Sequence, residues 1–367
     1  MRQSMNYRVS WSDLPIELLE KIGKSLETRI DVSRFRSVCQ SWRFSVAFSC
    51  DPSSPAFPLN IPFILGADRT QRDCSVLTMS VLYRLQLPPS DQNLTAASTS
   101  LPRSRISLVR VEEAENGKLR ILDPLSGRHL KQVSNFFPEV LNLLNFRVFE
   151  LGKAYRLQSC YGSYKAVFSS SNPNGSSSST NSAFVVMLVI CGVLCYLKLG
   201  DENWTIINDL ESQLEFEDVI HHDGKFYAVD IRGRAVAVDS NMVVSEIASP
   251  LYDESCGKGH RQRLVKSLGD LLLVDRCPFN EVLLFKVFKL NWDTKEWIRV
   301  KNLGDQVLLM GDDCSFVVSA QDFDDCKGNC IYVGPNFGVR RGRLSGPENG
   351  VFSLENGTYA ACTSYGC

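Results

Sequence analysis

The spacing of apolar residues predicts helices at the start of the chain. Within residues 11–48, apolar side chains recur at intervals of three and four, which is the period of an amphipathic helix. Ser12 or Asp13 can cap a first helix, and Pro15 suits its first turn, where a missing N–H group costs nothing. The apolar residues expected on one face of this helix are Leu18, Leu19, Ile22 and Leu26.

A second helix is predicted from Asp31, whose side chain can cap it. Its apolar positions are Val32, Phe35, Val38, Cys39 and Trp42. A helical segment of about thirty-five residues is too small to bury such side chains alone. It either docks on the rest of the chain or completes its core with a partner. The proline-rich residues 51–62 favour the partner, because they separate the helices from the remainder of the chain.

From about residue 63 the pattern changes to short β-branched or aromatic runs between Gly, Asp, Asn and Pro, which predicts strands. One sequence pattern recurs: a glycine, then a variable residue, then an apolar run. Two of its copies begin 45 residues apart, at Gly224 and Gly269. A repeat of about 40–50 residues made of several strands is typical of β-propeller blades. Roughly 300 residues at about 45 per blade predict six or seven blades. An irregular pair of β-sandwiches is the alternative.

Turns and insertions can be placed within this region. "IRGR" (231–234) is expected to join two antiparallel strands, with Gly233 at positive φ. "DPLSGR" (123–128) predicts a similar turn. "DTKE" (293–296) predicts a hairpin closed by a Trp packed between blades. The polar insertions, expected to be mobile surface loops, are 88–105 and 169–182.

Residues 183–199, "AFVVMLVICGVLCYLKL", raise the question of a membrane span. The uncharged run from Ala183 to Leu197 is fifteen residues long, shorter than the roughly eighteen that a spanning helix needs. It is rich in Val and Ile and interrupted by Gly192. Two buried strands joined at Gly192 are therefore predicted.

Composition indicates an ordinary globular protein without a polyanionic partner. Apolar residues make up 44% and charged residues 22% of the 367 residues, and the net charge is −1. We expect no nucleic-acid and no membrane partner. The thirteen cysteines form no CxxC pairs and the four histidines do not complete zinc motifs, so no metal, no cofactor and mostly reduced thiols are expected. No secretion signal is visible, which predicts an intracellular protein, in the nucleus, the cytoplasm or both.

Two acidic stretches leave a weak enzymatic alternative. "GDDC" (311–314) and "FDDC" (323–326) place paired carboxylates beside a cysteine. A propeller hydrolase with a metal site could use Asp312, Asp313, Asp324 and Asp325. Turn formation is the commoner role of such residues, and the HExxH, GxSxG and Walker A patterns are absent. No catalytic residue is assigned, and the chain is not expected to be an enzyme.

The helical segment resembles the F-box, the short three-helix motif that binds the Skp-type adaptor of SCF ubiquitin ligases. The resemblance rests on Leu14-Pro15, Leu18-Leu19, Ile22 and "RFRSVCQSWR" (34–43), in that order. The region after the linker resembles the β-propeller found behind the F-box in KIB-type, Skp-interacting-partner-like plant proteins. The stretches that carry this likeness include "LDPLSGR", "KLGDENWTIIND", "FEDVIHHDGKFYAVDIRGRAVAVD" and "GVFSLENG".

The resemblance implies a mainly β protein with an F-box at residues 10–50, a linker at 51–62 and a propeller at 63–367. It implies a substrate receptor that binds a Skp-type adaptor and, through it, a cullin-RING ligase, while the propeller recruits an unknown protein for ubiquitination. A scaffold or regulator that acts outside the ligase is the alternative. The residues implied to bind the adaptor are Leu14, Pro15, Leu18, Ile22, Val38, Trp42 and Arg43.

Overall fold

The chain divides into two compact units, residues 1–56 and residues 57–367. The computed structural model describes residues 11, 14–24, 29–46, 55, 57–62, 75–86, 106–113, 119–130, 147–159, 162–171, 183–207, 215–253, 259–279, 282–323, 326–338 and 349–361. The first unit contains helices and the second contains almost only strands. This division follows the change in apolar spacing along the sequence.

Three short helices form the first unit: α1 (Ile16–Lys24), α2 (Arg29–Arg36) and α3 (Gln40–Ser45). Both α1 and α2 lie against α3. The predicted second helix is therefore two helices, since the chain leaves helical geometry between Arg36 and Gln40. Asp31 is the third residue of α2, so the helix begins two residues earlier than predicted. The predicted caps of α1, Ser12 and Asp13, lie outside the described residues.

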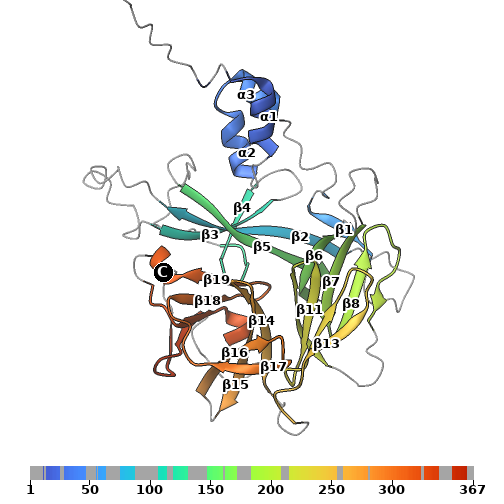
Figure 1. Cartoon of the computed structure of the whole chain (residues 1–367), viewed down its shortest axis with the longest axis vertical. Helices are drawn as coiled ribbons and strands as arrows, with labels where there is room; N and C mark the ends of the chain where they lie inside the picture. The colour runs from blue at the N-terminus through green and yellow to red at the C-terminus, as the bar shows by residue number, and fades with distance from the viewer. Residues whose placement is uncertain are drawn as a thin grey trace, which may run out of the picture. The chain divides into compact units, whose positions relative to one another are not determined.

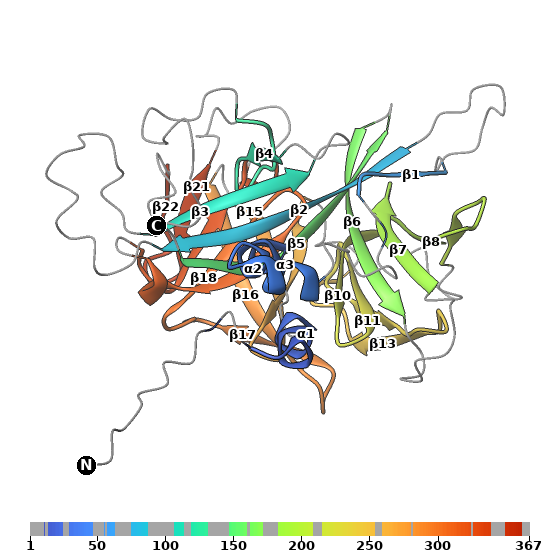
Figure 2. The ribbon, with the colours of Figure 1, turned by 90° about the horizontal axis from the view of Figure 1, so that it is seen from above.

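The second unit contains four sheets (Figure 1). The nine-stranded sheet comprises β1 (Leu59–Ile61), β2 (Ser75–Gln86), β3 (Ile106–Glu113), β4 (Leu119–Leu122), β5 (Arg147–Ser159), β6 (Gly162–Ser171), β7 (Ala183–Ile190), β8 (Val193–Lys198) and β9 (Thr205–Ile206). Figure 2 shows its long strand β2 running between β3 and β5, with which it pairs antiparallel.

The other sheets come after it in chain order. The second comprises β10 (Phe216–His222), β11 (Lys225–Asp230), β12 (Ala235–Val238) and β13 (Val244–Ala248). The third comprises β14 (Arg261–Ser267), β15 (Asp270–Phe279), β16 (Val282–Asn291) and β17 (Glu296–Val300). The fourth comprises β18 (Gln306–Met310), β19 (Ser315–Ser319), β20 (Cys330–Val333), β21 (Gly350–Ser353) and β22 (Tyr359–Ala361). The short helices 320–322 and 335–338 accompany the fourth sheet.

These sheets close into a ring. The inner strands β5, β6, β10, β14 and β19 lie next to one another in that order, and β19 returns to β5. Five hydrophobic clusters fill the interfaces around the ring, one of them between the two halves of the nine-stranded sheet. The described residues thus form five strand groups, and the predicted six or seven blades are not confirmed.

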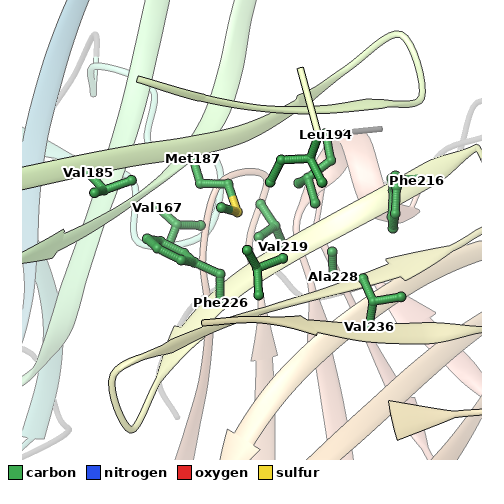
Figure 3. Packing of buried hydrophobic residues seen from close by; sticks show 11 residues of the cluster. Val167, Val185, Met187, Leu194, Phe216, Val219, Phe226, Ala228 and Val236 are labelled. Carbon is green, nitrogen blue, oxygen red and sulfur yellow. The ribbon is translucent and has the colours of Figure 1, made fainter. Parts of the chain in front are cut away.

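The cluster between the first and second sheets illustrates how the ring is held. Figure 3 shows Val185, Met187 and Leu194 facing Val219, Phe226 and Val236 across the interface, and all are buried. Such side chains alternate with residues on the opposite face of each strand. A sheet buried on both faces explains the continuous apolar runs of β7 and β12.

Several local predictions are confirmed. β11 and β12 pair antiparallel around "IRGR", with Gly233 at φ 88°. The two copies of the recurring pattern that lie 45 residues apart in the sequence, from Gly224 and Gly269, form β11 and β15, the second strand of consecutive sheets. The apolar run 183–199 forms β7 and β8, joined at Gly192 with φ 79°. Within the described part of the chain, no helix is long and apolar enough to cross a membrane.

Other predictions are corrected or lie outside the described residues. The linker predicted at 51–62 is too long, because β1 pairs with β2 and belongs to the nine-stranded sheet. The insertion 88–105 lies outside the described residues; of 169–182, residues 169–171 end β6 and the remainder also lies outside. Most described cysteines carry free thiols, but Cys326 is disulfide-bonded, so the expectation of reduced thiols fails there.

Candidate functional site

Helix α1 carries apolar residues on two sides. Leu19 is fully buried and Gly23, four residues later, is buried on the same face. A side chain at Gly23 would collide with the Val46 side chain, so glycine permits this close approach. Leu18 and Ile22 form a neighbouring row on the helix, and their side chains are 48% and 38% exposed. The prediction that Leu18, Leu19 and Ile22 share one face is therefore wrong.

Helices α2 and α3 are joined by an aromatic contact and two hydrogen bonds. The rings of Phe35 and Trp42 have centroids 4.5 Å apart, and Phe35 is buried. Arg36 NH1 donates to Arg43 O at 2.9 Å, and Arg43 Nε donates to Arg36 O at 3.2 Å. Trp42 Nε1 donates to Trp11 O at 3.0 Å. These contacts fix the short segment between the helices, where Val38 lies.

The seven predicted adaptor-binding residues differ in exposure. Pro15, Leu18, Ile22, Val38 and Arg43 are exposed, and Leu14 and Trp42 are half-buried. The structure therefore leaves these side chains on or near the surface of the helical unit, but their role stays a prediction. The sequence reasoning missed three exposed apolar side chains of the same unit, Trp11, Ile16 and Phe44. Trp11 precedes α1 and Phe44 lies in α3, so neither belongs to the apolar row of α1 on which the sequence reasoning relied.

The propeller contains a buried ionic cluster at Asp313. Arg110 NH1 and NH2 donate to Asp313 Oδ1 and Oδ2 at 2.7 and 2.6 Å, and Arg156 Nε donates to Oδ2 at 2.9 Å. Burial alone would raise the pKa of Asp313, but the two guanidinium groups outweigh it and hold the pKa below its usual value. The cluster joins the first sheet to the last. Asp313 therefore has a structural role at the closure of the ring.

A second buried cluster joins three sheets at Asp218. Lys165 Nζ lies 2.7 Å and Arg263 NH1 3.0 Å from the same oxygen, Asp218 Oδ1, and the backbone N–H of Leu264 donates to Oδ2 at 2.9 Å. Burial lowers the pKa of Lys165, and Asp218 opposes this effect. The three side chains come from β6, β10 and β14. Their bonds therefore connect consecutive inner strands.

The metal-site alternative gains no support from these positions. Both carboxylate oxygens of Asp313 already accept hydrogen bonds from arginines, and Asp324 and Asp325 lie outside the described residues. Among the described residues, His260, Asp275 and Cys277 form a group of the kind that can hold a metal. There, Cys277 Sγ donates to Asp275 at 2.9 Å. Burial, then Asp275, raises the pKa of Cys277 to about 12, and His260 Nδ1 also lies 2.9 Å from Asp275 Oδ1, so hydrogen bonds connect the members of this group.

Comparison with known families identifies the second unit. The family model described as the KIB1-4 beta-propeller matches residues 74–353. This range begins immediately before β2 and ends with β21. It therefore spans nearly all the strands of the propeller and none of the helical unit.

Curated relatives match both units. F-box protein SKIP23 of Arabidopsis thaliana is 30% identical over 391 residues, covering 95% of this chain and 90% of that protein. The putative F-box protein At5g60060 of the same plant is 29% identical over 366 residues, covering 94% and 93%. F-box protein At2g17036 is 28% identical over 356 residues, covering 89% and 83%. The similarity thus includes the helical segment as well as the strands.

Proposed function

This chain belongs to the KIB1-4 beta-propeller family of plant F-box proteins, and from that membership we propose that it is the substrate-receptor subunit of an SCF-type ubiquitin ligase. In this role the helical unit binds a Skp-type adaptor and, through it, a cullin-RING ligase. The propeller holds a protein target. The ligase role implies an intracellular location, in the nucleus, the cytoplasm or both.

The observation that carries this proposal is the exposed apolar surface of the helical unit. Leu19 and Phe35 are the buried large apolar side chains among its described residues. A larger set is exposed: Trp11, Ile16, Leu18, Ile22, Val38 and Phe44. Exposed apolar groups in so small a unit indicate a protein-binding surface, since burying them against a partner's helices removes them from water.

The proposed subunit contributes no reacting group. Ubiquitin transfer would depend on holding a target lysine close to an enzyme bound elsewhere in the ligase, so that proximity supplies the rate enhancement. The buried acids support this assignment, because Asp313 and Asp218 are bound to basic side chains within the fold. They connect sheets to one another.

A pull-down with a purified Skp-type adaptor tests the proposal. The test variant of the full chain is Leu18→Ala/Ile22→Ala, and the matched control is Glu20→Ala/Lys21→Ala, which alters two exposed charged residues of the same helix. We expect the test variant to lose adaptor binding and the control to keep it. Truncating two central apolar anchors costs about 2 kcal/mol or more of binding free energy, roughly thirtyfold in affinity.

Two results would contradict the assignment. If the unaltered chain fails to bind any Skp-type adaptor, the helical unit is not a functional F-box. If the test variant binds as tightly as the control, another surface makes the contact. Co-purification of a cullin with the adaptor distinguishes a ligase subunit from a scaffold, which would bind the adaptor without the cullin.

A further inference from the structure

A cavity of about 900 Å³ lies among the inner strands of the propeller, and residues of all four sheets line it. Strands β5 and β6 contribute residues 151–155 and 165–168, and β10 contributes Ile220 and His221. The end of β14 with its turn contributes residues 266–268, and the fourth sheet contributes residues near β18 and β19. This volume is within the range of pockets that bind ligands.

Lysines outnumber aspartates in the lining of the cavity. Lys153, Lys165 and Lys266 line it, together with Asp305 and Asp313, and Lys153 Nζ lies 4.0 Å from Glu150 Oε1. Asp313 is bound by two arginines, and Lys165 shares the single carboxylate of Asp218 with Arg263. Lys266 is exposed and forms no ion pair with any residue that the structure describes. An anionic group therefore meets a field favourable to it.

The turn beside Lys266 presents a second feature, Leu268. This side chain is 90% exposed, and its backbone has φ 46°. The equivalent turn of the preceding sheet has Asp223 at the same φ, followed by glycine in both cases. Asp and Asn favour this left-handed conformation, whereas a branched apolar residue is disfavoured there. Leu268 thus contributes neither burial nor turn propensity to the fold, and a disfavoured residue retained in this conformation beside a cavity points to a functional role.

We propose that this cavity and Leu268 together bind an acidic peptide segment of the target protein, in which a glutamate or aspartate stands beside an apolar residue. The carboxylate enters the cavity towards Lys153, Lys165 and Lys266. The apolar neighbour packs on Leu268 at the rim and against the cavity wall, which includes Phe316. This inference rests on the proposed role as a substrate receptor, and it names the chemistry of the substrate segment.

The lining favours a carboxylate over a phosphate. Phosphate groups are typically bound by arginine, whose planar guanidinium donates two parallel hydrogen bonds. The described lining residues include lysines and one histidine but no arginine. Arg110, Arg156 and Arg263 are already engaged with Asp313 and Asp218. The apolar wall further suits a peptide in which charged and apolar residues alternate.

Fluorescence anisotropy of the full chain with a labelled peptide of alternating leucine and glutamate tests this inference. Two comparison peptides replace glutamate by glutamine or by phosphoserine. The charge variant is Lys153→Glu/Lys266→Glu, with Lys198→Glu on β8, outside the cavity lining, as its matched control. Leu268→Asn removes the apolar side chain and suits the turn. This variant should therefore weaken peptide binding without lowering the unfolding temperature of the protein.

We expect the charge variant to weaken binding of the glutamate peptide about tenfold or more, and the control to change it less than about twofold. The glutamine peptide should bind at least about tenfold more weakly, and affinity should fall with added salt. The inference is overturned if no peptide binds, if the glutamine peptide binds equally well, or if Lys198→Glu weakens binding as much as the charge variant. If the phosphoserine peptide binds more tightly than the glutamate peptide, the site prefers a phosphate to a carboxylate, and the assigned chemistry is overturned.

The adaptor pull-down on the same proteins separates this inference from the proposed function. Variants that no longer bind the peptide but still bind the adaptor place the peptide site in the propeller, as inferred. A chain that binds the adaptor but none of the peptides leaves the receptor role intact and refutes the cavity site. A chain that binds neither adaptor nor peptide contradicts both.

Discussion

The helical unit and the propeller distribute apolar and charged side chains in opposite ways. In the helical unit, Leu18 and Val38 are exposed while the described buried core is small. In the propeller, charged side chains such as Arg110, Asp313 and Asp218 are almost fully buried, and apolar clusters fill each interface between neighbouring strand groups. One unit leaves apolar side chains exposed, and the other encloses charged side chains in its interior.

This difference shows where each unit obtains its stability. A propeller has many interfaces between sheets. A buried carboxylate that accepts hydrogen bonds from two guanidinium groups connects strands that are distant in the sequence, and its negative charge is compensated. The helical unit has too few residues to build an equivalent interior. Mutations should therefore act on stability in the propeller and, at the exposed row of α1, on binding alone.

The largest effect is expected from Asp313→Ala. It leaves the buried guanidinium groups of Arg110 and Arg156 without their shared carboxylate, so we expect a loss of about 3–5 kcal/mol in the free energy of unfolding of the propeller. Urea denaturation followed by tryptophan fluorescence measures it. The control is Asp322→Ala, whose carboxylate pairs with Arg84 and is 43% exposed. Its loss should cost less than about 1 kcal/mol. Equal effects of the two variants would contradict the structural role assigned to the buried cluster.

The same carboxylate predicts a dependence of stability on pH. Its pKa is lower in the folded than in the unfolded state, because Arg110 and Arg156 favour the ionised form more than burial disfavours it. Its contribution is therefore complete above the unfolded value of about 3.9 and is lost as the pH falls through the folded value. As the pH is lowered from about 6 to about 3, the urea concentration at the unfolding midpoint should fall less steeply in Asp313→Ala than in the unaltered chain. Parallel pH profiles for the variant and the unaltered chain would contradict the shift.

Neighbouring residues of α1 provide the next comparison. Leu19→Ala removes a fully buried side chain and should destabilise the helical unit by about 2–5 kcal/mol. Leu18→Ala alters a side chain that is 48% exposed and should change stability by less than about 0.5 kcal/mol while reducing adaptor binding. Amide hydrogen exchange in α1 measures the stability of this unit separately from the propeller. If amide hydrogen exchange in α1 accelerates as much in Leu18→Ala as in Leu19→Ala, then Leu18 supports the fold.

The strand pattern made much of the propeller predictable. The glycine before each apolar run marked a hairpin turn, as at Gly224 and Gly269, and both have positive φ in the structure. The number of strand groups was not predictable in this way, because two of them merge into one sheet through the pairing of β5 with β6. Pairing between distant segments leaves no periodic signal along the chain.

The candidate sites show the same limit. The apolar row of Leu18 and Ile22 follows from helical spacing, but the same spacing cannot say which of two adjacent rows is buried. Asp313 lay in a recognisable acidic stretch, yet its partner Arg110 is 203 residues earlier, so its structural role could not be predicted. The cavity likewise combines lysines from β5, β6 and β14, which no local motif connects.

The smallest of these effects concerns Trp297, which was expected between blades from its place after a hairpin. Its indole Nε1 donates to Gly233 O at 2.7 Å, so a side chain of the third sheet bonds to a turn of the second. Trp297→Phe keeps an aromatic ring in the cluster but leaves that carbonyl without this donor. We expect a loss of about 1–3 kcal/mol in the unfolding free energy, measured by urea denaturation. The control Trp292→Phe alters a Trp that is 46% exposed and should change it by less than about 0.5 kcal/mol. If Trp297→Phe is no more costly than the control, the hydrogen bond from the indole adds nothing measurable to stability, and apolar packing accounts for the contribution of Trp297 at this interface.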